Sequence, residues 1–249
     1  TIICKIIRII HYILIKIDIS NSNQFLLTMD IKKLINESVK TNWKDILINC
    51  IEPYEDIINT KLSLAYSNSD KIFPEKALIF NCFNYFNVED IKCIIIGQDC
   101  YHTRDVANGL CFSHYQQKNN KLQPSLRNIF KELQRTEGII RKESDLSDWA
   151  NQGCLLINMS LTVLEGKPNS HSNIWNPFLN TLVKWIAENC ENICVMLWGN
   201  FAQTTEIYFH NTNNIVLKSG HPSPLNTKNP FIGCGHFEKC KEYHNINWV

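Results

Sequence analysis

Four short apolar runs constrain the fold of this chain more than any other feature of its sequence. They cover residues 92–97, 154–158, 193–199 and 215–219. The runs show no regular alternation of apolar and polar residues, and each is bounded by Gly, Asn or Ser. This pattern is typical of strands that are buried on both faces of a parallel sheet.

Amphipathic patterns between these runs predict helices at residues 124–134, 177–189 and 204–209. The first two begin with proline, which is favoured in the first turn of a helix. In the first pattern, one helical face carries Leu126, Ile129, Phe130 and Leu133. Strands that alternate with helices predict the α/β class, as a three-layer α/β/α sandwich around a four-stranded, mainly parallel sheet.

The 249-residue length suits one α/β domain with a tail. We assign residues 29–249 to the domain and residues 1–28 to an Ile-rich N-terminal extension. Charged residues interrupt this extension, so it is a poor candidate for a membrane-spanning helix. We therefore expect that the protein does not need a membrane as a partner. Three interpretations stay open for it: a dispensable segment, a targeting or surface helix, and an integral part of the fold.

Charge and cysteine content exclude several classes of protein. With 25 Lys and Arg against 24 Asp and Glu, the net charge of +1 excludes a polybasic nucleic-acid binder. Binding to nucleic acid would need a local patch or uncharged contacts to phosphate. The eleven cysteines form no CxxC pair and no zinc spacing, so we expect no metal site. Cys93, Cys154 and Cys194 lie in apolar runs and predict buried thiols in a reducing intracellular compartment.

Polar residues gather where the four runs end. The first run leads into GQDCYH with Asp99, the second ends at Asn158, the third leads into Gly199, and the fourth precedes HPSPL with His221. Alone, Asp99 could be a helix cap and His221 a loop histidine. In open α/β sheets, however, ligands bind outside the carboxyl ends of the strands. The four strand ends together therefore predict one site.

The motifs GQDCYH, GLCFS, LQPSLRNIFKEL, CLLIN, PNSH, VMLWGNFAQ and GHPSPLN occur in one order along the chain. In that order and spacing the chain resembles the family 1 uracil-DNA glycosylases, from about Trp43 to its C-terminus. The resemblance implies a cofactor-free enzyme of base-excision repair that flips uracil out of DNA and hydrolyses its N-glycosidic bond, leaving an abasic site. It also implies a monomer that acts on uracil in single- and double-stranded DNA. The nucleus or cytoplasm is the expected location, mitochondrial targeting is a weaker alternative, and a replication or repair partner is an open option.

The resemblance also implies a role for individual residues. Asp99 would orient water and favour positive charge on the sugar, and His221, as a neutral imidazole, would stabilise the departing uracil. Substrate binding is assigned to four residues: Gln98, Tyr101, Phe112 and Asn158. Asn158 would read one edge of uracil, Tyr101 would exclude the thymine methyl, Phe112 would stack on the base, and Gln98 would contribute backbone contacts. DNA binding is assigned to eight residues: His102, Pro124, Ser125, Gly199, Asn200, Pro222, Ser223 and the apolar wedge Leu225.

The chain departs from the family pattern at Cys100, where the family has proline. We expect cysteine to relax the loop that carries Asp99 and to remove an apolar surface facing DNA, which reduces activity without abolishing it. Asn200 stands where serine is usual, and residues 103–105 replace a Gly-Pro segment. The main alternative function is a DNA-binding replication accessory protein with weak or lost catalysis. A zinc deaminase and an iron–sulfur glycosylase lack their required motifs here.

Overall fold

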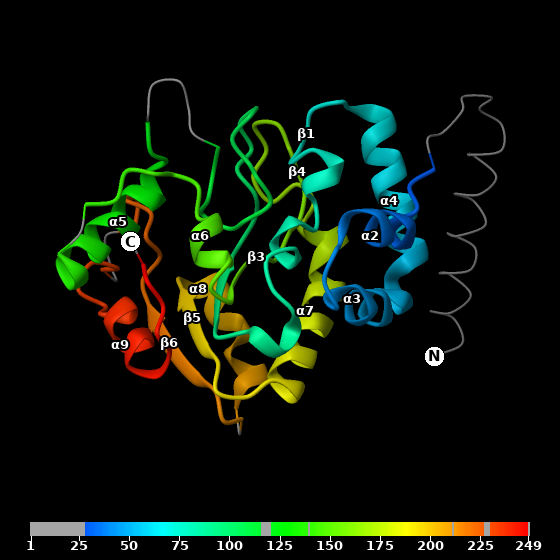
Figure 1. The fold of residues 1–249 in the computed structure, drawn as a ribbon. Helices are drawn as coiled ribbons and strands as arrows, with labels where there is room; N and C mark the ends of the chain where they lie inside the picture. The colour runs from blue at the N-terminus through cyan, green and yellow to red at the C-terminus, as the bar shows by residue number, and fades with distance from the viewer. Residues whose placement is uncertain (1–27, 116–120, 139, 211, 227–229, 249) are drawn as a thin grey trace.

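A sheet of four parallel strands forms the centre of the protein in the computed structural model (Figure 1). The structure describes residues 28–115, 121–138, 140–210, 212–226 and 230–248. The strands are β2 (Cys93–Gly97), β3 (Cys154–Asn158), β5 (Cys194–Trp198) and β6 (Ile215–Ser219), in the order β3-β2-β5-β6. All four predicted strands are confirmed to within a residue at each end. The sheet is fully parallel, so its four carboxyl ends meet at one edge.

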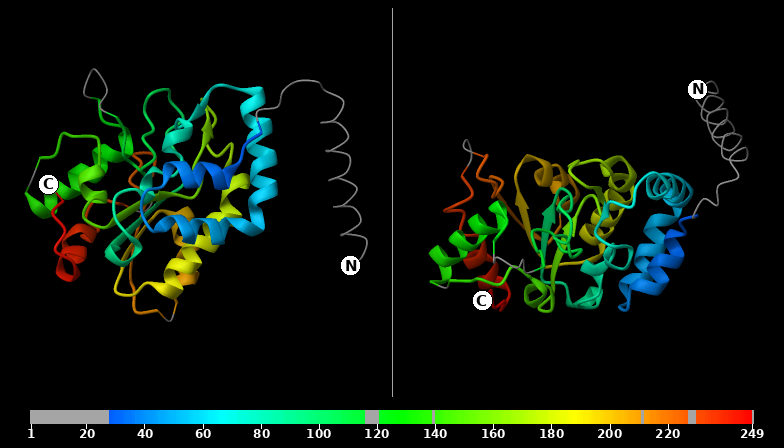
Figure 2. Two further views of the ribbon diagram at one scale, coloured as in Figure 1. Left: turned by 45° about the vertical axis from the view of Figure 1, so that its right-hand side comes forward. Right: turned by 90° about the horizontal axis from the view of Figure 1, so that it is seen from above.

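Helices cover both faces of this sheet, which confirms the predicted three-layer sandwich (Figures 1 and 2). One layer contains α2 (Ile31–Ser38), α3 (Trp43–Ile51), α4 (Glu55–Asn68) and α7 (Ser172–Asn189). The other contains α5 (Pro124–Glu137) and α9 (His236–Tyr243). Two short α-helices also occur: α6 (Ser147–Ala150) and α8 (Asn200–Gln203). The 3₁₀ helices are η1 (Glu52–Tyr54), η2 (Lys76–Leu78), η3 (Asn81–Phe83), η4 (Val88–Asp90) and η5 (Thr204–Phe209).

The helix predicted at residues 177–189 begins five residues earlier than expected. Pro177 therefore lies inside α7 and not in its first turn. Proline has no N–H to donate to the carbonyl four residues before it, here that of Asn173. The Lys61 ammonium donates to that carbonyl at 3.3 Å and satisfies it. The predicted helix at 204–209 is a 3₁₀ helix, while the predicted helix at 124–134 is confirmed and extends to Glu137.

A single main hydrophobic core runs from Ile31 to Trp248. Cys93, Cys154 and Cys194 are fully buried in it, which confirms their predicted placement. A two-stranded antiparallel sheet of β1 (Ile72–Phe73) and β4 (Val163–Leu164) lies apart from the main sheet. No helix in the described part of the chain is long and apolar enough to cross a membrane. The prediction for the extension at 1–28 falls, except for its last residue, outside the described residues.

Candidate active site

A cavity of about 230 Å³ opens at the carboxyl ends of the parallel strands. Both predicted catalytic residues, Asp99 and His221, line it. So do the four predicted substrate-binding residues, namely Gln98, Tyr101, Phe112 and Asn158, and two of the predicted DNA-binding residues, His102 and Ser125. The fold thus brings residues from three strand ends and three further segments into one pocket.

Asp99 follows β2 and is held from a loop that lies 70 residues away in the sequence. Its Oδ2 accepts a hydrogen bond from the backbone N–H of Asn169 at 2.7 Å. Burial raises the pKa of Asp99 above its ordinary value, while the bond from Asn169 and the nearby His102 act in the opposite direction. The pocket therefore presents a carboxylate that is only partly solvated and whose orientation is fixed.

Asn169 is a functional residue that the site assignment from sequence missed. Besides binding Asp99, its Oδ1 accepts from the Gln98 amide at 2.7 Å. Its backbone has φ 62°, in the left-handed region that asparagine tolerates better than most residues. The only sequence signal for Asn169 was its place in the PNSH motif, and this motif does not predict a hydrogen bond to Asp99.

His221 follows β6, and its hydrogen bonding defines which nitrogen carries the proton. The Nδ1 atom accepts from the backbone N–H of Ser223 at 3.0 Å, so in the neutral ring the proton sits on Nε2. Burial lowers the pKa of His221. The residue is therefore a neutral imidazole at pH 7, with an Nε2–H donor.

Asn158 ends β3 directly beside Gly97 of β2. Its side chain is buried, and a Cβ at Gly97 would lie 2.3 Å from its Oδ1. On its other side, Nδ2 lies 3.6 Å from the Cys100 sulfur. The amide is thus packed closely on both sides, which restricts the orientation of its donor and its acceptor.

Tyr101 and Phe112 form an aromatic wall of the pocket. The Tyr101 hydroxyl donates to the backbone carbonyl of Phe112 at 2.9 Å. The Phe112 backbone has φ 60°, and its ring centroid lies 5.5 Å from Trp198 and 5.9 Å from His221. A flat apolar face therefore stands next to the imidazole donor, as a pocket for a planar heterocycle requires.

Comparison with known proteins places this pocket in a family. Residues 83–244 match the model of the uracil DNA glycosylase superfamily. The chain belongs to this superfamily. It is 41% identical to the uracil-DNA glycosylase of Borreliella burgdorferi, over 85% of this chain and 97% of the relative. It is 45% identical to that of Dictyostelium discoideum, over 81% of this chain and 59% of the relative. The fold matches the crystal structure of mimivirus uracil-DNA glycosylase with a TM-score of 0.77 and 24% identity, over 84% of both chains.

The predicted family, fold class and glycosylase activity are therefore confirmed, and the chain is a DNA N-glycosylase of base-excision repair. Within the described ranges, no group of three or more His, Cys, Asp or Glu side chains could hold a metal ion.

At Cys100 the glycosylase differs from the sequence prediction. The side chain is 6% exposed and points inward, where the thiol lies 3.5 Å and 3.4 Å from the carbonyl oxygens of Ser160 and Leu161. Burial, followed by the charge of Asp99, raises the pKa of Cys100 to about 12, so the thiol stays protonated and can donate. The expectation that this position carries a surface facing DNA is wrong, because the side chain is buried where it lines the pocket.

Two of the predicted DNA-binding residues, Gly199 and Pro222, have little free surface in this structure. Gly199 is buried and its N–H donates to the Ser219 carbonyl at 2.9 Å, so that group is not free for phosphate. Its role is to let His221 pack closely, because a Cβ there would lie 2.8 Å from the His221 Cβ. The ring of Pro222 is buried, which leaves no apolar face for DNA.

The remaining predicted DNA-binding residues lie around the mouth of the pocket or beyond it. Pro124 and Ser125 start α5, and Asn200 is the exposed first residue of α8. The Ser223 hydroxyl accepts from the Leu225 N–H at 3.2 Å, and the Leu225 side chain is 91% exposed. A large apolar side chain with almost no protein contact fits a residue that packs against a partner.

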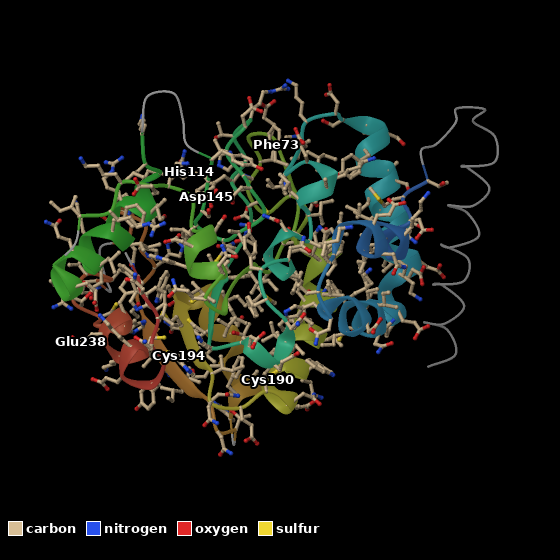
Figure 3. All side chains as sticks on the ribbon, in the orientation of Figure 1. Phe73, His114, Asp145, Cys190, Cys194 and Glu238 are labelled. Atoms are coloured by element: carbon tan, nitrogen blue, oxygen red, sulfur yellow. The ribbon has the colours of Figure 1, made fainter. Side chains whose placement is uncertain are left out.

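His114 is a second residue that the sequence did not reveal. Its ring stands edge-on to Tyr101 with centroids 5.8 Å apart, and its Nε2 accepts from the backbone N–H of Gln123 at 3.3 Å. Burial lowers the pKa of His114, while the bond to the Tyr115 carbonyl and the charge of Asp145 oppose that shift. His114 and Asp145 lie next to each other in Figure 3. His114 thus ties the aromatic wall to the residue that precedes α5.

Proposed function

We propose that this glycosylase cleaves the bond between uracil and deoxyribose with Asp99 and His221 as its two catalytic groups. The observation that carries this proposal is that an anionic carboxylate and a neutral N–H donor line one cavity. Uracil leaves as an anion, so positive charge develops on the sugar and negative charge on the base. Asp99 stabilises the sugar and orients the attacking water, and the Nε2–H of His221 donates to the departing uracil oxygen.

Uracil is selected by shape and by one amide. The Asn158 amide both donates and accepts, so it pairs with the edge of uracil and leaves cytosine mismatched. Tyr101 occupies the space beside C5, where thymine carries a methyl group. Phe112 stacks on the flipped base, and the backbone of Gln98 adds contacts to it. The close packing around Asn158 supports this assignment, because an amide that could turn over would read both bases.

The DNA is held by uncharged groups around the pocket. Hydroxyl and N–H groups of His102, Ser125, Asn200 and Ser223 donate to phosphates, and Pro124 shapes the loop before α5. Leu225 enters the base stack at the vacated position. A chain of net charge +1 then binds undamaged DNA only weakly.

Residues 29–249 form the catalytic domain, and the enzyme acts as a monomer on both single- and double-stranded DNA. The continuous core from Ile31 to Trp248 supports a single domain. The extension at 1–28 is dispensable for excision or serves targeting.

One assay tests the proposed function. The protein is incubated with single- and double-stranded oligonucleotides that contain one uracil, in the presence of a chelator. We expect alkali-sensitive cleavage at uracil, and the loss of most of this cleavage in Asp99→Asn with DNA binding retained. Intact DNA binding without cleavage by the wild type would instead favour the replication accessory role.

A further inference from the structure

Helix α5 contacts the chain around Leu225 from two positions on one face. We define the wedge loop as residues 220–226 and the return segment as residues 230–235, which leads into α9. We propose that Glu132 and Asn128 are positioning residues. They hold the wedge loop, and with it Leu225, at a fixed distance from Ser125, where a phosphate of the DNA binds. This inference rests on the proposed function, because the wedge role of Leu225 belongs to it.

The Glu132 carboxylate is buried, with a side-chain exposure of 0%, and both of its oxygens are engaged by the return segment. Oε2 accepts from the Gly233 N–H at 2.7 Å, and Oε1 accepts from the Gly235 N–H at 2.8 Å. The Cys234 thiol, 3.6 Å from Oε1, lies between these two donors. One side chain of α5 therefore gathers three consecutive residues of the return segment.

The charge of Glu132 is compensated on its other side. The Arg135 guanidinium donates to both oxygens, at 3.0 Å and 2.9 Å. Burial acts to raise the pKa of Glu132, but the bonds from Arg135, Gly233 and Gly235 outweigh it and lower the pKa. Glu132 is therefore ionised, and the N-terminus of α9, which begins after Gly235, adds a favourable dipole.

Asn128 engages the wedge loop itself. Its amide donates to the Pro222 carbonyl at 2.8 Å. Asn128 and Glu132 are four positions apart in α5, so they lie on one face of the helix. Within the loop, the Asn226 amide donates to the His221 carbonyl at 3.1 Å. The loop carrying Leu225 is thus bonded to α5 through Asn128, and the return segment is bonded one turn further along through Glu132. In Figure 1 the orange chain runs beside the green helix α5.

The first turn of the same helix carries Ser125. A phosphate bound at Ser125 and a base step entered by Leu225 must be a fixed distance apart on duplex DNA. Flexible single-stranded DNA imposes no such distance, because its backbone can adapt. A rigid connection between Ser125 and Leu225 through α5 should therefore affect the rate of uracil excision from a duplex, and affect the rate from a single strand much less.

Glu132 is also connected to the aromatic wall of the pocket, through the residues that follow the return segment. Gly235 precedes His236, whose Nδ1 accepts from the Trp198 indole at 3.0 Å, and Trp198 packs against Phe112. A purely structural role for Glu132 would therefore disturb the pocket for every substrate. The duplex-to-single-strand comparison separates the two roles.

The test measures single-turnover excision of uracil from a single strand and from the same sequence in a duplex. We expect Glu132→Gln to lower the duplex rate about tenfold more than the single-strand rate, because the amide cannot accept from all its present donors. Asn128→Ala should give a smaller loss of about threefold with the same selectivity. Gln134→Ala, an exposed change on the same helix, serves as the matched control and should leave both rates unchanged.

A double-mutant cycle with Leu225→Ala shows whether Glu132 acts through the wedge. In the Leu225→Ala background, Glu132→Gln should cause little further duplex-specific loss. Equal loss on both substrates, or a duplex loss that adds fully to that of Leu225→Ala, would overturn the proposal. If Glu132→Gln does not fold, Asn128→Ala decides, and unchanged rates for it would overturn the proposal. A wild-type protein that excises uracil from neither substrate would refute the proposed function itself.

Discussion

Replacing Gly97 by alanine should disable uracil reading without removing any side chain from the pocket. The added Cβ would lie 2.3 Å from Asn158 Oδ1 and 2.8 Å from the Cys111 Cβ. Gly97 does not occupy the left-handed backbone region, so the effect is steric. Carbon and oxygen prefer a separation of about 3.5 Å, so the Asn158 amide must retreat by about 1 Å.

The size of this displacement determines the loss of excision rate that we expect. Hydrogen bonds from Asn158 to uracil would lengthen from about 2.9 Å to about 3.9 Å, beyond the hydrogen-bonding range. Losing two such bonds at about 1.5 kcal/mol each removes about 3 kcal/mol of transition-state stabilisation. The single-turnover rate on a uracil oligonucleotide should then fall about 10²-fold.

Overpacking also costs about 1–3 kcal/mol of folding free energy, so the melting temperature must be measured beside the rate. Gly138→Ala is the matched control. Gly138 ends α5 with φ 72° and has open space around it, so alanine there costs about 1–2 kcal/mol of strain without touching the pocket. A Gly97→Ala protein that excises uracil at the wild-type rate would refute the role assigned to Asn158.

Three further changes probe the same site. Asp99→Asn should lower single-turnover excision about 10²–10³-fold with unchanged affinity for duplex DNA in gel-shift titrations, and a loss below tenfold would contradict its catalytic role. In a pH–rate profile, activity should fall as pH falls through the pKa of Asp99, which burial raises above its ordinary value, because protonation removes its charge. Burial lowers the pKa of His221 below its ordinary value, so a separate loss of activity with a midpoint at or above pH 6.5 would contradict its role as a neutral donor. Cys100→Pro should raise excision about two- to fivefold, because proline fixes φ in the loop that carries Asp99 and the thiol contacts at 3.4–3.6 Å are weak, whereas a fall in rate would show that the thiol supports Asn158.

The strands and the pocket residues could be predicted because their signals are local. A fully buried parallel strand is a short apolar run, and the chain itself places the residues at and just after its end at the carboxyl edge of the sheet. Asn158 is the last residue of β3, and Asp99 and His221 each lie two positions beyond the end of their strand. The start of α7 was harder to place, because a proline usually marks a first turn and only the tertiary contact from Lys61 makes Pro177 acceptable inside the helix.

Residues that act through tertiary contacts could not be predicted in the same way. Asn169 reaches Asp99 across 70 residues of sequence, and nothing in PNSH specifies this bond. The burial of Cys100 and Pro222 likewise depends on what packs over them. A motif gives the order of the residues, but the direction of each side chain comes from the assembled loops.

The central claim is that one pocket releases uracil and rejects the other pyrimidines. The most direct measurement is the single-turnover rate of base release by the wild-type protein, with a chelator present, from three duplexes that differ only in carrying uracil, thymine or cytosine at one position. We expect rapid release of uracil and no measurable release of thymine or cytosine, because in the proposed mechanism Tyr101 excludes the thymine methyl group and the Asn158 amide does not match the hydrogen-bonding edge of cytosine. Release of all three bases at similar rates, or of none, would contradict the account.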